Sequence, residues 1–208
     1  DQISDKNIVI TGTDVNHIRN VLRMAPGEEV TVSDGQGMDY FCKIAELTKE
    51  EVRLDIIDSW HSFVELPAKI YLFQGLPKAD KMELIIQKAV ELGVYEIVPV
   101  ATKRAVVKLD AKKEEKKRLR WQSIAESAAK QAGRALIPQV APCMNFDKAL
   151  RMCNGLDAAL IPYEKAEGMQ HARDQVRALH GKHSIGIFIG PEGGFEESEI
   201  EAARGAGA

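Results

Sequence analysis

The sequence has 208 residues, of which 45% are hydrophobic and 28% are charged, a composition typical of a soluble globular protein large enough to bury a core. No apolar run approaches the roughly 18–20 residues that span a bilayer, and the three cysteines lack Cys-x-x-Cys spacing, which argues against a disulfide framework and a zinc site. The composition therefore predicts a cytoplasmic protein with no membrane segment and no bound metal.

The formal net charge is −3, but the charges are unevenly distributed. Residues 1–65 contain 6 Lys and Arg against 13 Asp and Glu, residues 66–150 contain 16 against 9, and residues 151–208 contain 6 against 9. A basic middle between acidic flanks favours a localised surface for a polyanion over a uniformly cationic protein. The run from Lys112 to Arg120 can equally be the solvated face of a helix, and charge alone does not decide between the two.

The first 66 residues have the pattern of a small β-rich domain. Residues 14–24 have helical spacing, with Ile18, Val21 and Leu22 on one face. Strand-like runs follow at residues 30–33, 40–47 and 52–57, and a Gly-containing turn separates the first two. We therefore expect a compact, largely antiparallel β module over residues 1–66, with residues 59–67 as a linker.

Strands and helices alternate over residues 67–208. The predicted strands are residues 70–74, 96–100, 158–162 and 185–189. The predicted helices are residues 80–93, 114–133, 169–179 and 196–204. Asp80 followed by Glu83 has the spacing of a capping box, and Gly93 is a C-terminal stop signal. Strands that alternate with helices predict an α/β domain with a mostly parallel sheet.

A glycine-rich turn follows the last predicted strand, in the sequence Ile185-Gly-Ile-Phe-Ile-Gly-Pro-Glu-Gly-Gly194. Gly193 and Gly194 permit positive φ and close backbone approach to a ligand, and Pro191 stiffens the bend. Ligands bind at the carboxyl ends of strands in open α/β sheets. The segment is neither the dinucleotide-binding G-x-G-x-x-G motif nor a Walker A loop. By itself, the pattern is also that of a tight structural turn.

Several segments resemble, in the same order, the bacterial ribosomal RNA small-subunit methyltransferase E family. They are His17-Ile-Arg-Asn-Val-Leu-Arg23, Gly75-Leu-Pro-Lys-Ala-Asp-Lys-Met-Glu83, Ile86-Gln-Lys-Ala-Val-Glu-Leu-Gly93, Val106-Val-Lys108, Arg120-Trp121, Ala128-Ala-Lys-Gln-Ala-Gly-Arg134, Ile137-Pro138 and Ile189-Gly-Pro-Glu-Gly-Gly194. The resemblance implies a PUA-like β-barrel domain at residues 1–66 and a SPOUT-type (trefoil-knot) α/β domain at residues 67–208. It further implies a homodimeric enzyme that uses S-adenosylmethionine to methylate N3 of a uridine in 16S rRNA of the small ribosomal subunit.

The resemblance and the positions after strands together suggest the site residues. The candidate cofactor-binding residues are Ile161, Pro162, Tyr163, Glu164, Ile189, Gly190, Pro191, Glu192, Gly193 and Gly194. The candidate RNA-binding residues are Arg19, Arg23, Lys78, Lys81 and Arg134. Trp121 lies beside the basic run and is predicted to pack in the core rather than to stack on a base.

Methylation of uracil N3 sets the chemistry that the site must perform. The base must be unpaired, because N3 lies on its Watson–Crick edge. Loss of the N3 proton calls for a general base or for positive groups that stabilise the imide anion. Glu164 and Glu192 are the candidate catalytic carboxylates. The alternative interpretation makes Glu164 an exposed loop residue and Glu192 an acceptor that stabilises its loop.

Family members continue with a segment resembling Leu-Gly-x-Arg-Ile-Leu-Arg-x-Glu-Thr-Ala, which would thread the knot and which this sequence does not contain. We therefore expect the cofactor pocket formed by these residues to be open and incomplete. Two other functions fit the same features. The chain can be a non-catalytic RNA-binding or ribosome-assembly factor that has kept the fold, or a SPOUT methyltransferase that acts on another RNA such as tRNA.

Overall fold

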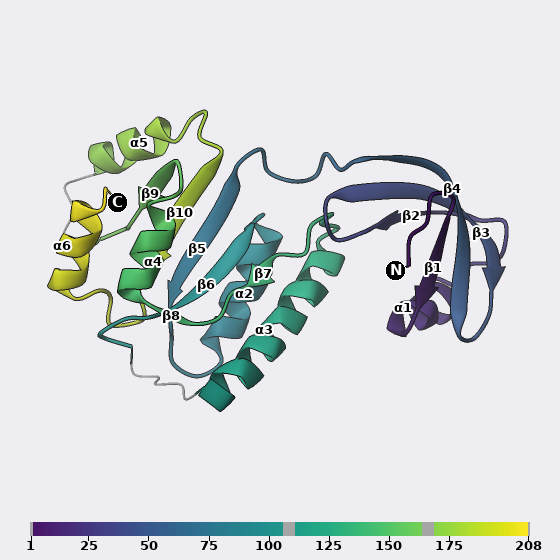
Figure 1. Cartoon of the computed structure of the whole chain (residues 1–208), viewed down its shortest axis with the longest axis horizontal. Coiled ribbons are helices and arrows are strands. Elements are labelled where there is room, and N and C mark those ends of the chain that lie inside the picture. Colours follow the sequence, from purple (N-terminus) through teal and green to yellow (C-terminus); the bar gives the residue numbers. More distant parts are fainter. Residues whose placement is uncertain (1, 106–110, 164–168, 208) are drawn as a thin grey trace. The chain divides into compact units, whose positions relative to one another are not determined.

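The computed structural model describes residues 2–105, 111–163 and 169–207 (Figure 1). The chain divides into two compact units, residues 1–65 and residues 66–208. The segment at residues 106–108 that carries part of the family resemblance lies outside the described residues. In the described part of the chain, no helix is both long enough and apolar enough to cross a membrane.

The first unit is a four-stranded antiparallel sheet with the strand order β1-β4-β3-β2. Its strands are β1 (Asn7–Thr11), β2 (Glu29–Ser33), β3 (Met38–Leu47) and β4 (Glu51–His61). The three later strands were predicted, whereas β1 was not. Strand β4 continues to His61, so the expectation that the linker begins at residue 59 was wrong.

The helical segment between β1 and β2 buries fewer apolar side chains than its periodicity predicts. It consists of α1 (Thr13–Asn16) and a π-helical turn, η1 (His17–Val21), in which the Leu22 amide donates to the His17 carbonyl. A π turn winds more widely than an α-helix and breaks the 3.6-residue spacing. Ile18 is therefore buried, but Val21 and Leu22, expected on the same face, are 61% and 53% exposed.

The second unit is built on a parallel sheet with the order β7-β6-β5-β10-β9, and β8 pairs with the far end of β6. The strands are β5 (Lys69–Gly75), β6 (Glu96–Ala101), β7 (Gln139–Val140), β8 (Met144–Asn145), β9 (Ala158–Leu160) and β10 (Ser184–Ile189). The helices are α2 (Lys81–Glu91), α3 (Ala111–Gln131), α4 (Phe146–Cys153), α5 (Met169–Ala178) and α6 (Glu197–Gly205). The predicted parallel α/β arrangement is confirmed, although β7, β8 and α4 were not foreseen.

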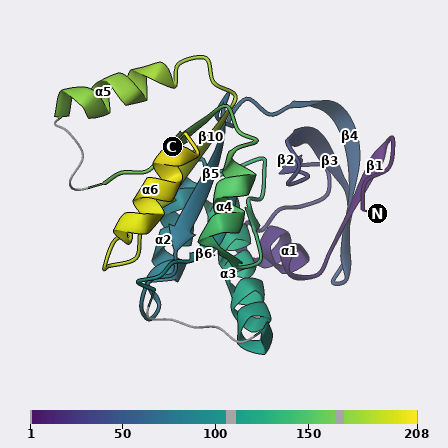
Figure 2. The ribbon, with the colours of Figure 1, turned by 60° about the vertical axis from the view of Figure 1, so that its left-hand side comes forward.

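Helices cover both faces of this sheet, because neighbouring residues of a buried strand point to opposite sides. Phe73 and Val98 pack with α4 and α6, and the rings of Phe73 and Phe188 stack with their centroids 4.5 Å apart. Leu72 and Ile97 pack with α2 and α3. Figure 1 shows α4 and α6 to one side of the strands and α2 and α3 to the other, and Figure 2 shows the same arrangement with α4 and α6 in front.

Helix α3 settles two sequence-based expectations. Trp121 is a packed core residue, as predicted. The capping box expected at the start of α2 is absent, because Asp80 makes no side-chain cap hydrogen bond. The Glu83 carboxylate instead pairs with Arg120 of α3, at 2.7 Å from its Nε. The acidic residue thus joins two helices rather than closing the end of one.

Candidate functional site

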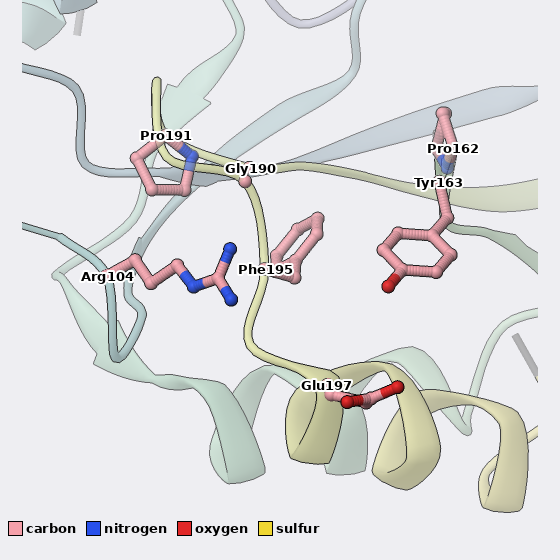
Figure 3. A pocket seen from close by; sticks show the side chains of 8 residues that line it. Arg104, Pro162, Tyr163, Gly190, Pro191, Phe195 and Glu197 are labelled. Carbon is pink, nitrogen blue, oxygen red and sulfur yellow. The ribbon is translucent and has the colours of Figure 1, made fainter. Parts of the chain in front are cut away.

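A cavity of about 230 Å³ opens at the carboxyl ends of the parallel strands (Figure 3). Pro162 and Tyr163 follow β9, Arg104 follows β6, and Glu197 lies in the first turn of α6. The remaining wall is the segment from Gly190 to Phe195, here called the glycine loop, which follows β10 and contributes Gly190, Pro191, Gly194 and Phe195. Strands distant in sequence therefore deliver their following residues to one place, as expected for a ligand site in an open α/β sheet.

The glycine loop is tightly folded on itself. The Gly194 amide donates to the Pro191 carbonyl at 2.8 Å, and Gly194 has a φ of 66°. A Cβ on Gly190 would lie 3.1 Å from the Gly194 Cα. Glycine is thus favoured at position 190 by close packing and at position 194 by the backbone angle. Gly193 does not adopt the positive φ that the sequence suggested.

The turn after β5 holds one side of this loop. A Cβ on Gly75 would lie 2.7 Å from the Pro191 Cδ and 2.9 Å from its nitrogen, so the two backbones touch. The buried Gln74 side chain donates through Nε2 to the Gly75 carbonyl at 2.9 Å. The loop therefore has little room to move toward β5.

Glu192 fastens the loop to the same side. Its two carboxylate oxygens accept from the Lys78 amide at 3.2 Å each, and Lys81 Nζ lies 2.9 Å from Oε1. These interactions, with the Lys81 hydrogen bond as the largest, lower the pKa of Glu192 to about 2. A carboxylate that binds a proton so weakly is a poor general base at neutral pH. The geometry favours the alternative interpretation of Glu192, in which it stabilises its loop.

Arg104 holds the opposite side of the loop. Its Nη1 donates to the Gly193 carbonyl at 2.9 Å, and its Nε lies 3.5 Å from the Glu196 carboxylate. Glu196 also caps α6 in a reciprocal capping box with Glu199, a carboxylate that is buried and accepts from the amides of Lys103 and Glu196. Both neighbouring loops therefore position the glycine loop through charged side chains.

Residues 64–208 match the family model described as an RNA methyltransferase domain, and residues 10–57 match an RNA methyltransferase PUA domain. The ribosomal RNA small subunit methyltransferase E of Bacillus subtilis (strain 168) is 39% identical over 195 residues, which cover 92% of this chain and 76% of the relative. The chain belongs to the ribosomal RNA small subunit methyltransferase E family.

Two solved structures show the same likeness. The family member from Neisseria gonorrhoeae, bound to S-adenosyl methionine, is 31% identical with a TM-score of 0.81, and the match covers 99% of this chain and 83% of that one. A methyltransferase from Legionella pneumophila with the bound cofactor SAM is 30% identical with a TM-score of 0.77, covering 97% and 81%. The expected PUA-like domain and RNA methyltransferase domain are thereby confirmed.

Within this methyltransferase, half of the candidate cofactor residues line the cavity. They are Pro162, Tyr163, Gly190, Pro191 and Gly194. Ile161 packs against the core and Ile189 ends β10, whereas Glu192 and Gly193 lie on the glycine loop but line no part of the cavity. Glu164 lies outside the described residues.

The candidate RNA-binding residues belong to several elements of the two units. Lys78 and Lys81 lie beside the glycine loop, where Glu192 binds them, and the exposed Arg19 and Arg23 belong to the other unit. The Arg134 side chain donates through Nη1 to the carbonyls of Val90 and Val94, at 3.1 and 2.7 Å. Arg134 thus has an intramolecular role at the end of α2, and its contact with RNA stays a prediction.

The sequence reasoning missed three residues of the cavity, namely Arg104, Phe195 and Glu197. Each follows a predicted strand or the turn after it, which was a usable signal, but none belongs to the glycine-rich motif at residues 190–194. Among the described residues, no three His, Cys, Asp or Glu side chains are grouped as ligands of a metal ion.

Replacing Lys81 with Ala should raise the pKa of Glu192 from about 2 toward its ordinary value of 4.5, because the largest stabilising interaction of the carboxylate is lost. Because the pKa is lowered, the contact of Glu192 stabilises the folded loop at every pH above the ordinary pKa of a glutamate. This stabilisation is lost as the pH falls through the lowered pKa of the folded protein. In the variant, the contact should therefore weaken at a higher pH. Carbon NMR of the side-chain carboxyl measures both values.

Lys88→Ala is the matched control, since Lys88 pairs with Glu91 on α2 and not with Glu192. It should leave the pKa of Glu192 unchanged. Equal values in the wild type and in Lys81→Ala would mean that the ion pair does not hold the loop.

Proposed function

We propose that this chain transfers the methyl group of S-adenosylmethionine to N3 of a uridine in 16S rRNA of the small ribosomal subunit, and that it does so in the cytoplasm as a homodimer. The observation that carries this proposal is the cavity at the glycine loop, at the carboxyl edge of the sheet. Support comes from the relatives. The Bacillus subtilis protein is a small-subunit rRNA methyltransferase by name, and the Neisseria gonorrhoeae structure holds S-adenosyl methionine.

The residues of the cavity fit this cofactor. Pro162, Tyr163 and Phe195 offer apolar and aromatic surface for an adenine or ribose, while Gly190 and Gly194 expose bare backbone in the wall of the cavity. A side chain at Gly190 would fill the turn that forms this wall. The cavity of about 230 Å³ is smaller than the roughly 300–1,000 Å³ of common ligand sites, so it accommodates part of the molecule.

The bound cofactor supplies a methyl group that is already activated by its sulfonium. The residues of this chain have to hold the donor and the unpaired uracil in line and to manage the N3 proton. The glycine loop suits the first task because Glu192 and Arg104 hold it in one conformation from both sides. Because the loop is already ordered, ligand binding does not carry the entropic cost of ordering it.

Titration calorimetry and methylation of small-subunit RNA test the proposal. The full-length protein should bind S-adenosylmethionine saturably and introduce a methyl group that stops reverse transcription at one uridine, since N3 lies on the pairing edge. Gly75→Ala should weaken cofactor binding about tenfold or more, because a Cβ there collides with Pro191 of the glycine loop. Gly205→Ala is the control, since its added Cβ meets no atom within 4 Å.

The rival functions give different results in the same experiments. A non-catalytic RNA-binding factor would bind RNA but show no saturable cofactor binding. A methyltransferase of another RNA would bind the cofactor and leave small-subunit RNA unmodified while methylating, for example, tRNA.

The proposed RNA contacts of the first unit can be measured through salt dependence. Arg19→Gln and Arg23→Gln should each reduce the slope of log affinity against log salt concentration by about 1, because one phosphate contact releases about one counterion. Both side chains are exposed and available for such a contact. Lys182→Gln is the control, since it lies before β10, at the end of the sheet opposite the glycine loop. Unchanged slopes in both arginine variants would move the RNA surface elsewhere.

The proposed homodimer is tested by light scattering of the full-length protein. The resemblance to the family leads us to expect a symmetric two-fold assembly, in which the same surface of each subunit is buried. The measured mass should be twice that of one chain at micromolar concentration. A monomeric mass under those conditions would contradict the assembly without affecting the proposed reaction.

A further inference from the structure

Arg104 is a fixed cation on the wall of the proposed methyl-transfer cavity. It lines the cavity together with Tyr163 and Phe195, and Figure 3 shows its guanidinium extending from the loop after β6 toward the glycine loop. Nη1 is bound to the Gly193 carbonyl, and Nε lies 3.5 Å from the Glu196 carboxylate. Two anchors on different atoms restrict the rotation of the planar group, so its position is defined before any ligand arrives.

The third nitrogen of this guanidinium remains available. Nη2 donates no hydrogen bond to any residue in the described parts of the chain, and the side chain is 47% exposed. A guanidinium is always protonated at physiological pH and can only donate hydrogen bonds. The free edge of Arg104 therefore suits an acceptor with negative charge that enters the cavity.

The carboxylates around the glycine loop are poorly suited to remove the proton of uracil N3. Glu192 is bound by Lys78 and Lys81 on the side away from the cavity. Glu196 caps α6 and faces Arg104, and both oxygens of the buried Glu199 accept backbone hydrogen bonds. Of the carboxylates in the described residues, only Glu197 lines the cavity, and it is exposed to solvent.

We propose that Arg104 is a catalytic residue of the methyl transfer, and that its Nη2 donates a hydrogen bond to a uracil carbonyl oxygen beside N3 and stabilises the imide anion. This inference rests on the proposed function. The N3 proton leaves to solvent water, and the electron pair left on N3 forms the new bond to the methyl carbon. The carbon–sulfur bond breaks as this bond forms, and sulfur keeps its electron pair. The anionic base and the cationic sulfonium thus both become neutral.

The anion carries most of its negative charge on the two carbonyl oxygens that flank N3. A donor that is already in place opposite such an oxygen stabilises the charge without reorganisation, which is the most effective form of electrostatic catalysis. Loss of one donor of this kind typically lowers kcat by about 100- to 1,000-fold. The anchors at Gly193 and Glu196 give Arg104 the required rigidity.

Arg104→Gln in the full-length protein, assayed with normal RNA and with RNA carrying 5-bromouridine at the modified position, tests this role. Bromine makes N3 more acidic and reduces the need for stabilisation of the anion. We expect kcat on uridine to fall about 100-fold or more, and the loss on 5-bromouridine to be at least tenfold smaller. Arg104→Lys should restore part of the activity, because it keeps the charge but not the planar geometry.

Binding measured without cofactor gives a second readout. The wild type should bind the 5-bromouridine RNA more tightly as the pH rises through the pKa of its N3, whereas Arg104→Gln should show no such gain. The affinity for S-adenosylmethionine should fall only slightly in Arg104→Gln, because the Gln amide can still donate to the Gly193 carbonyl and hold the glycine loop. Arg177→Gln is the matched control, since Arg177 also lies 3.5 Å from a carboxylate, that of Asp174, but on exposed α5. It should behave as the wild type in every assay.

Three results would overturn the proposal. An equal loss of kcat on both RNAs would leave Arg104 a merely structural role. A much weaker affinity for S-adenosylmethionine in Arg104→Gln, with no change in the binding of 5-bromouridine RNA, would assign the residue to the cofactor. If 5-bromouridine restored kcat in Glu197→Gln but not in Arg104→Gln, Glu197 would be the general base that removes the N3 proton. If the wild type methylates neither RNA, the proposed function itself fails, an outcome distinct from these three.

Discussion

The methyltransferase domain depends on one close approach, between the ends of the adjacent strands β5 and β10. These strands pair in parallel register over six positions, from Lys69 opposite Ser184 to Gln74 opposite Ile189. Because they end at the same level, the turns that follow must leave the sheet side by side. A side chain at Gly75 would overlap Pro191, so the two turns can lie together only where one has no Cβ. The position of the glycine loop follows from this packing.

Charged side chains also help to fix the position of the glycine loop. Glu192 joins the glycine loop to the turn after β5, and Arg104 joins it to the loop after β6. Both side chains are partly exposed, so each contact is individually weak, as surface ion pairs are. Together they restrict the position of the glycine loop, because they hold this short segment from opposite sides. A site that must align a donor and an acceptor for transfer gains rate from such order, since misplacement of about 1 Å can cost about 100-fold.

The two units follow different structural rules. The N-terminal sheet has a single buried face, on which Cys42, Ile44, Val52 and Leu54 pack under α1 and η1. The parallel sheet is covered on both faces and carries two separate cores. Polar strand residues are therefore tolerated in the first unit, whereas strands such as β6 in the second are almost continuously apolar. This contrast explains why the change of pattern near residue 66 was visible in the sequence.

The sequence by itself determined the alternation of strands and helices, the glycine-rich turn after β10 and the membership of the family, because these are written in residue spacing and in contiguous motifs. It also placed Pro162, Tyr163 and Gly190 after strands, where they line the cavity. Only the tertiary structure decided which charged residues meet. Glu83 binds Arg120 instead of capping its own helix, Arg134 binds the carbonyls at the end of α2, and Arg104 reaches Gly193. The first two pairings depend on how α3 packs against α2. The third depends on the strand order β6-β5-β10, which brings together residues almost ninety positions apart. Residue spacing determines the type of a local element and its buried face, but not which other elements pack against it. The order of the strands is therefore decided only by the tertiary structure.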